Sequence, residues 1–161
     1  MTETFVRNVA DSTAVEHPVS GIKVYFDHYD APFRDTGINI IVLEPGQPGC
    51  KYHSESVQED FLVLGGTPLL LLEGEERPLR AWDFVHCEPG AHHVFVGAGE
   101  GPSWILQVGA RREDATIDFP VSELAAKYNA STPEPADDGD VAYSDWEDDL
   151  TVVTAPWPPV S

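Results

Sequence analysis

Hydrophobic residues between positions 21 and 110 are grouped in short segments that alternate with turn residues. Val, Ile, Leu and Phe dominate these segments, and glycine, proline and acidic residues fill the intervals between them. The segments cover residues 22–29, 38–44, 60–64, 68–72, 82–86, 92–96 and 103–110. Short apolar segments punctuated in this way predict an all-β domain of sandwich or barrel type.

The 161 residues suffice for one domain with a hydrophobic core, but they are too few for two domains of ordinary size. Ser122 stands where it can cap a short helix, because good helix formers follow it. The pattern therefore predicts an N-terminal arm (1–20), a β-domain (21–120), a short helix (121–130) and an acidic, proline-rich tail (131–161).

The C-terminal part of the chain permits more than one interpretation. Residues 130–149 combine Pro, Gly and acidic residues with few aliphatic ones, which predicts a mobile or loosely docked segment. Trp146, Val152, Val153 and Trp157 either anchor the tail on the domain or on a second subunit, or belong to a frayed end.

Charge and cysteine content narrow the classes of function. The 28 acidic residues outnumber the 9 basic ones, and the formal charge of −19 argues against nucleic acid or an anionic membrane as partner. Cys50 and Cys87 are too few for a disulfide scaffold, and we expect reduced thiols that pack in the interior. The first residues lack a secretory pattern, and the longest apolar run (61–72) is broken by Gly and Pro, so we expect a soluble cytoplasmic protein.

Histidine and glutamate side chains occur where several of the predicted strands begin. Residues two apart on a strand face the same way, so His53 and Glu55 share one face and can converge with Glu59 from the neighbouring strand. Of the adjacent His92 and His93, one must point inward and the other away, and if His93 points inward, Phe95 does so too. An acid inside a small barrel is costly unless it is paired or binds a metal ion.

Alternation also predicts the surroundings of these residues. Lys51 shares the face of His53, while Phe61, Val63 and Phe95 share the faces of Glu59 and His93, which describes an apolar chamber with one cation at its edge. Such a chamber suits a small acidic or partly apolar substrate. His86 lies near the predicted barrel mouth, and we expect it to be structural.

The first stretch resembles the first sequence motif of the cupin superfamily. That motif runs glycine, His, any residue, His, three or four residues, Glu, six residues and Gly. His53, Glu59 and Gly66 match it in order and spacing, whereas Glu55 stands at the position of the second histidine.

A later stretch resembles the second cupin motif. Pro89, Gly90 and His93 follow its Pro-Gly-x-x-His form, Asp83 stands where a Gly-Asp pair often opens the strand, and Gly97 replaces the usual Asn. The resemblance covers roughly residues 36–110. It implies a cupin-type antiparallel β-barrel of jelly-roll type, and it also implies a homodimer.

The resemblance further implies one divalent metal ion, held by His53, Glu55, Glu59 and His93. Carboxylate ligands favour iron or manganese, with zinc and nickel as alternatives. If Glu55 does not bind the ion, the other three residues form the two-His, one-carboxylate set of non-haem Fe(II) oxygenases. Glu55 is then a catalytic acid or base beside the ion. A site that has lost its metal altogether is the third interpretation.

These ligand sets lead to three functional hypotheses. The first is a small-molecule metalloenzyme that resembles the dioxygenases and depends on Fe(II) or Mn. The second is a metal-dependent isomerase, epimerase or lyase that acts on a sugar or small acid, with Glu55 moving a proton. The third is a non-catalytic domain that binds a small ligand.

Overall fold

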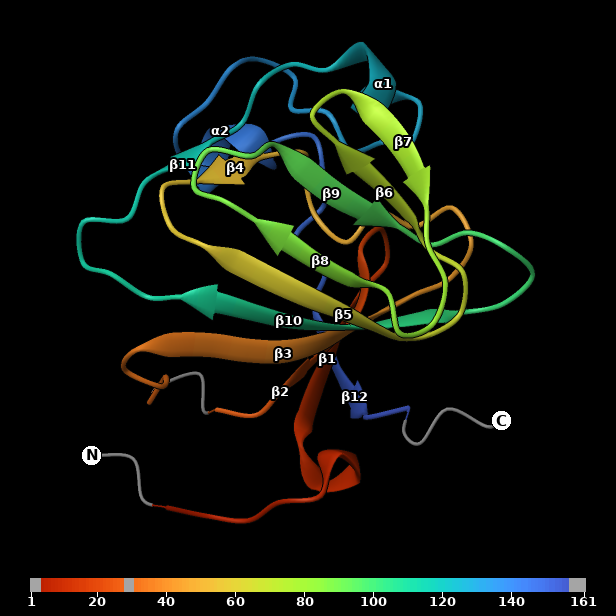
Figure 1. Ribbon diagram of the computed structural model, residues 1–161, viewed down its shortest axis with the longest axis vertical. Coiled ribbons are helices and arrows are strands. Elements are labelled where there is room, and N and C mark those ends of the chain that lie inside the picture. The colour runs from red at the N-terminus through yellow and green to blue at the C-terminus, as the bar shows by residue number, and fades with distance from the viewer. Residues whose placement is uncertain (1–3, 28–30, 157–161) are drawn as a thin grey trace.

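The strands of the protein form two facing antiparallel layers. The computed structural model describes residues 4–27 and 31–156, and Figure 1 shows the larger sheet below the smaller one. The larger sheet has seven strands in the order β12-β1-β2-β3-β10-β5-β8. Their bounds are β1 (Thr13–His17), β2 (Gly21–Tyr25), β3 (Thr36–Leu43), β5 (Glu59–Gly65), β8 (Phe84–Cys87), β10 (Ser103–Ala110) and β12 (Thr151–Thr154).

The opposite layer consists of shorter strands. A three-stranded sheet has the order β7-β6-β9, and β4 pairs separately with β11. Their bounds are β4 (Ser54–Glu55), β6 (Leu69–Leu72), β7 (Glu75–Pro78), β9 (His93–Val96) and β11 (Ile117–Asp118). Three short helices complete the fold, namely η1 (Val9–Asp11), α1 (Glu123–Ala126) and α2 (Gly139–Ala142). This arrangement confirms the predicted all-β fold of jelly-roll type.

The main hydrophobic core fills the space between the two layers. It forms because β3, β5 and β10 of the large sheet turn alternate apolar side chains toward β6 and β9. The buried members of this core are Ile41, Leu43, Phe61, Val63, Leu70, Val85, Cys87, Phe95 and Ile105. Phe61, Val63 and Phe95 therefore pack in the interior, as alternation predicts.

The segments between residues 21 and 110 that the apolar pattern marks as strands contain strands in the structure. The turn between β5 and β6 depends on Gly66, which has a φ of +79°, and a Cβ atom there would lie 2.5 Å from the Pro102 carbonyl oxygen. This position therefore accepts only glycine without rearrangement. The capping role expected of Ser122 is also confirmed, since its side chain accepts a hydrogen bond from the backbone N–H of Ala125.

Five of the described strands, β1, β4, β7, β11 and β12, lie outside the expected segments. Thr13–His17 falls in the predicted arm but forms β1, which pairs with β2 on one side and with β12 on the other. Glu75–Pro78 forms the exposed edge strand β7, whose charged residues read as a turn in the sequence. Charged side chains are common on edge strands because they discourage pairing with other chains, so a polar sequence can still form a strand.

The C-terminal tail returns to the domain and packs on it. Ala142, which ends α2, is fully buried, and Thr132 is almost fully buried. Residues 130–149 are thus attached to the domain at a few buried positions, whereas most of their side chains are exposed. Val152 and Val153 anchor the end of the tail through β12, whereas Trp157 lies outside the described residues. No helix in the described ranges is both long enough and apolar enough to span a membrane.

Candidate metal centre

Three strands bring His53, Glu59 and His93 together. His53 and His93 form an isolated antiparallel bridge, with hydrogen bonds from His53 N to His93 O (3.2 Å) and from His93 N to His53 O (2.8 Å). Glu59 is the first residue of β5, and on this strand its side chain shares the inward face with Phe61. The three side chains consequently meet at one end of the barrel core.

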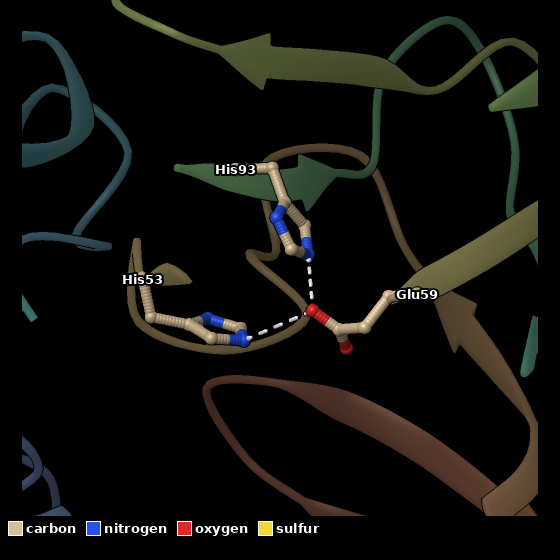
Figure 2. A group of neighbouring side chains, drawn as sticks. All are labelled: His53, Glu59 and His93. Atoms are coloured by element: carbon tan, nitrogen blue, oxygen red, sulfur yellow. Dashed lines mark ion pairs between the residues drawn. The ribbon is translucent and has the colours of Figure 1, made fainter. Parts of the chain in front are cut away.

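The donor atoms of these side chains point toward one another, as Figure 2 shows. Glu59 Oε2 lies 3.2 Å from His93 Nε2 and 4.0 Å from His53 Nε2. All three donor atoms lie within 4.8 Å of one another. The two histidines are buried, and the Glu59 side chain retains 16% of its exposure, so the cluster faces a narrow opening.

Backbone carbonyl groups fix the orientation of both imidazole rings. His53 Nδ1 lies 2.8 Å from the Lys51 carbonyl oxygen, and His93 Nδ1 lies 3.0 Å from the Ala91 carbonyl oxygen. Because a carbonyl oxygen can only accept, Nδ1 carries the hydrogen in each ring. In the neutral rings each Nε2 then directs its lone pair toward Glu59, which is the second-sphere arrangement typical of metal-binding histidines.

The cluster is electrostatically asymmetric. Burial and the neighbouring His93 lower the pKa of His53 to about 4. Burial opposes protonation of His93 as well, but hydrogen bonds to Cys87 and Glu59 outweigh it and raise the pKa of His93 to about 10. Burial alone would raise the pKa of Glu59, and the hydrogen bond from His93 and nearby positive charges together lower it. At neutral pH the metal-free cluster is therefore an ionised Glu59 beside one protonated and one neutral histidine.

Glu55 lies beside the cluster but does not belong to it. Its Oε1 atom is 4.0 Å from His53 Nε2, and the group of mutually close donor atoms contains only His53, Glu59 and His93 among the described residues. Burial, followed by the charge of Glu59, raises the pKa of Glu55. The position of Glu55 and its raised pKa fit a proton-exchanging group better than they fit a fourth metal ligand.

Phe119, backed by Tyr143 of the tail, supports His53 from outside. The Phe119 ring centroid lies 5.6 Å from that of His53, and the Tyr143 ring contacts Phe119 edge-on at 5.8 Å. The Tyr143 hydroxyl also accepts a hydrogen bond from Lys51 N (3.1 Å). Lys51 thus links the tail to the histidine through its own backbone.

Lys51 does not line the chamber, contrary to the prediction. Its side chain is completely buried, and Nζ donates to Ser131 O at 2.8 Å and approaches Asp145 at 2.7 Å. Nζ also lies 4.7 Å from the Trp146 ring centroid. Residues 49–52 form a bend and not a regular strand, so alternation does not place Lys51 on the face of His53.

His92, His86 and Cys50 are the remaining residues considered in the sequence analysis. His92 points away from the cluster, with Nε2 at 2.8 Å from Asp118. His86 lies at the sheet edge, where it contacts Asp60 at 2.6 Å, which agrees with a structural role. Cys50 packs against a hydrophobic cluster, as expected, and its Sγ also lies 3.6 Å from His53 Nδ1. Burial raises the pKa of Cys50 to about 12, so this contact involves a thiol.

Sequence reasoning missed two cations close to the cluster. Lys23 from β2 and Arg111 line the same cavity as Glu55 and Glu59. The alternation of β2 places Lys23 on the inner face, but a sheet order that sets β2 beside β3 cannot be read from the sequence. Arg111 has no comparable signal, because it follows β10 in a loop.

The donor set fits a divalent metal ion. Two imidazole nitrogens and one carboxylate oxygen suit Fe(II), Mn(II) or Zn(II), and three protein ligands leave positions for solvent and substrate. The Nδ1–carbonyl hydrogen bonds already hold the histidines in the binding tautomer. His53, Glu59 and His93 could therefore hold one ion.

Comparisons with known proteins agree with the jelly-roll fold described above. The Cupin domain family model matches residues 39–109. A putative sugar phosphate isomerase from Acidithiobacillus ferrooxidans has a similar structure, with a TM-score of 0.57, 23% identity, and coverage of 88% of this chain and 82% of that chain. The polyketide cyclase RemF from Streptomyces resistomycificus gives a TM-score of 0.59 at 15% identity, with 70% of this chain and 84% of that chain covered.

A cupin protein from Bacteroides fragilis gives a TM-score of 0.54 at 18% identity, and the match covers 71% of this chain and 89% of that chain. No curated protein matches the sequence. Identities this low support the fold and say nothing of the reaction. The two motifs, the jelly-roll topology and the match of residues 39–109 to the Cupin domain family model together support membership of the cupin superfamily.

Proposed function

We propose that the protein is a metal-dependent enzyme that acts on a small molecule at the His53, Glu59 and His93 cluster. The observation that carries this proposal is the orientation of both imidazoles, whose Nδ1 atoms are held by backbone carbonyls while their Nε2 atoms face one carboxylate. A bound divalent ion supplies a Lewis acid and, for iron, a centre for dioxygen chemistry.

Our first candidate is an Fe(II)- or Mn-dependent oxygenase. Two histidines and one carboxylate that leave open coordination positions are the donor set used by non-haem Fe(II) oxygenases. The apolar floor beneath the cluster supports this candidate, because Phe61 packs 5.2 Å from the His93 ring and excludes water from that side. The protein's own contribution is to bind the substrate beside the ligands and to shield it.

The second candidate is an isomerase, epimerase or lyase, and Glu55 is the observation that favours it. Its carboxylate lies next to the cluster and has a raised pKa, as a general acid or base requires. In the isomerisation of a hydroxy carbonyl compound, Glu55 takes the proton from the hydroxyl-bearing carbon, and the electron pair of the broken C–H bond forms a C=C bond while the carbonyl oxygen takes the negative charge. The proton then returns to the former carbonyl carbon, the hydroxyl proton passes to the former carbonyl oxygen, and the old hydroxyl oxygen becomes the new carbonyl.

An oxygen test separates the two candidates. The iron-loaded protein is incubated with small hydroxy and keto acids and with sugar phosphates, and dissolved oxygen is recorded. The zinc-loaded protein is incubated with the same compounds in D₂O without oxygen, and NMR records exchange of carbon-bound hydrogen. Oxygen uptake that His53→Ala abolishes supports the first candidate. Anaerobic exchange that Glu55→Gln abolishes supports the second.

A third outcome would remove both candidates. If compounds raise the melting temperature of the metal-loaded protein but neither react nor exchange, the proposal of an enzyme is wrong, and the domain binds ligands without turnover.

A further inference from the structure

A cavity of about 210 Å³ adjoins the candidate metal centre. The ligand Glu59 and the neighbouring Glu55 form one side of it, and Lys23, Asn39, Gln107 and Arg111 line the remainder. The volume corresponds to roughly seven water molecules at about 30 Å³ each. A ligand with few heavy atoms therefore fits between the acidic cluster and the cations.

Strand register explains how this cavity forms on the inner face of the large sheet. Asn39 of β3 lies opposite Gln107 of β10, and one row further along Gly37 lies opposite Gly109, which in turn lies opposite Glu59. A Cβ atom at Gly109 would contact the Glu59 side chain at 3.9 Å. The two glycines leave the floor open beside the ligand.

Lys23 differs from the other cations of the interior in having no carboxylate partner. Within residues 4–27 and 31–156 no acidic oxygen lies within 4.0 Å of its Nζ, and its contact is the Tyr25 ring at 5.5 Å from the centroid. Lys51, in contrast, is paired with Asp145, and Arg111 with Asp27. Lys23 is therefore the ammonium group in this cavity that is available to a ligand.

One neighbouring residue of the cavity, Asn39, also has a polar atom without a partner. Asn39 Oδ1 is buried without a hydrogen-bond partner in the described structure, although most buried polar atoms have one. Lys23 also lines a second cavity of about 400 Å³, together with residues of β1, β2 and β12. Asn39 lines the small cavity with Lys23, but its Oδ1 atom is buried and needs a donor, so Lys23 is the group that offers a contact to an anion.

The charge balance favours an anion. With a divalent ion bound, the ion and a protonated Lys23 would contribute three positive charges against two negative ones from Glu55 and Glu59, while Arg111 is neutralised by Asp27. The metal-loaded cavity would then have one excess positive charge in a chain with a formal charge of −19. Such a local excess attracts a small anion against the field of the whole chain.

We propose that Lys23 binds the carboxylate or phosphate group of a small anionic substrate, which extends from this lysine to the His53, Glu59 and His93 cluster. This inference rests on the proposed function and names the class of substrate for that site. Asn39 and Gln107 supply hydrogen bonds along the floor. The substrate is a short hydroxy or keto acid or a small phosphate ester.

The test uses glycolate, its neutral counterpart glycolamide, and inorganic phosphate as probes of the metal-loaded full-length protein. Calorimetric titration measures their affinity for the wild type, Lys23→Met, Lys23→Arg and Lys127→Met. Lys127 is an exposed lysine that lines none of the cavities described here, so it controls for the loss of one charge. Metal content and melting temperature are recorded for every variant.

We expect Lys23→Met to weaken the binding of glycolate or phosphate by at least about tenfold, because a hydrogen bond between charged groups is lost. Lys23→Arg should restore most of the affinity, and Lys127→Met should behave as the wild type. Glycolamide should bind weakly and equally to all four proteins. Preference for glycolate identifies an acid substrate, and preference for phosphate identifies a phosphate ester.

Equal affinity of wild type and Lys23→Met for both anions would overturn the proposal, and so would the failure of both anions to bind the metal-loaded wild type. These outcomes differ from a failure of the proposed function. If the protein takes up no metal but still binds an anion through Lys23, the proposed anion site is supported and the proposed metal centre is wrong.

Discussion

The two histidines at the candidate centre are held by the same kind of hydrogen bond. Each donates its Nδ1 hydrogen to the carbonyl two residues earlier, Lys51 for His53 and Ala91 for His93. A ring held in this way cannot turn without breaking a buried hydrogen bond, which costs about 1–3 kcal/mol. The main chain thus fixes the ligand geometry before any ion binds.

The two glutamates next to these rings should respond differently to the same substitution. Glu59→Gln removes the carboxylate that faces both Nε2 atoms and should reduce metal affinity by about 10-fold or more, since even outer-sphere partners contribute 10–100-fold. Glu55→Gln should retain the ion, because Glu55 lies outside the cluster. Competitive titration with a chelating dye measures both affinities. Loss of metal from Glu55→Gln would make that residue a ligand.

Metal binding should release close to one proton at pH 7. With a pKa of about 10, His93 is protonated in the metal-free protein, and its Nε2 must lose the proton before it can bind an ion. With a pKa of about 4, His53 is already neutral. Metal affinity should therefore rise about tenfold per pH unit between pH 7 and 9. Calorimetry in buffers of different ionisation enthalpy counts the protons. Release of none, or of two, would contradict the assignment.

The same shift affects the stability of the metal-free protein. The folded pKa of His93 lies above its ordinary value of 6.5, so its protonation stabilises the fold fully below pH 6.5. This contribution is lost as the pH rises from 6.5 to about 10. Urea unfolding of metal-free protein at several pH values should show the loss, and His93→Gln should remove this part of the pH dependence.

Alternation along short strands indicates that His53, Glu59 and one of the two adjacent histidines could converge, and the resemblance to the cupin motifs selects His93; the structure brings these three residues together. The same reasoning failed for the lysines. Lys51, placed in the chamber by alternation, lies in a bend and is buried against the tail, whereas Lys23 lines the cavity. The difference depends on backbone irregularity and on strand order, neither of which a period of two encodes.

At the level of elements, the C-terminal tail acts as a support for the first histidine strand. Tyr143 accepts the hydrogen bond of Lys51 N, and the Lys51 carbonyl accepts that of His53. Asp145 neutralises the buried ammonium group of the same lysine. A segment whose composition is typical of disorder is therefore ordered by one buried cation and its partners.

Tyr143→Phe tests this support. The substitution keeps the ring against Phe119 but leaves the Lys51 N–H without its partner, which should destabilise the fold by about 1–2 kcal/mol and weaken metal binding through His53. Tyr128→Phe is a matched control, because the Tyr128 hydroxyl contacts Glu76 at the surface. Urea unfolding and dye competition measure the two effects. Equal behaviour of the two variants would show that the tail does not position His53.

The strands themselves show where sequence patterns succeed and where they do not. β3, β5 and β10 are apolar or alternating segments between turn residues, and their burial gives them an unambiguous pattern. β12 has no clear pattern of buried positions, because its residues are mostly exposed. It forms a strand because it pairs with the free edge of β1. Edge pairing of this kind depends on the rest of the sheet and is not encoded locally.

At the scale of the whole molecule, the jelly roll places one polar cluster at the end of an otherwise apolar core. The core packs beneath the cluster, the tail closes its outer side, and cations of the large sheet line the approach. The formal charge of −19 is strongly negative, and from it we expect no binding to nucleic acids. Function on this scaffold depends on the site, because related barrels support different reactions.

The family resemblance implies a homodimer, and this stays a prediction. We expect light scattering during gel filtration to give twice the chain mass of 17.6 kDa at micromolar concentration. The exposed aromatic side chains Trp82 and Phe84, beside and on the edge strand β8, offer apolar surface that a second copy could cover. A mass of one chain over the same concentration range would contradict the expectation.

The measurement that tests the central claim most directly is elemental analysis of protein purified without a metal-affinity step. The account predicts close to one equivalent of a divalent metal, iron or manganese first, in the wild type. It also predicts loss of that metal in a folded His53→Ala, His93→Ala double variant. A wild type that carries no metal and takes up none when Fe(II), Mn(II) and Zn(II) are offered would contradict it, as would a double variant that keeps its ion.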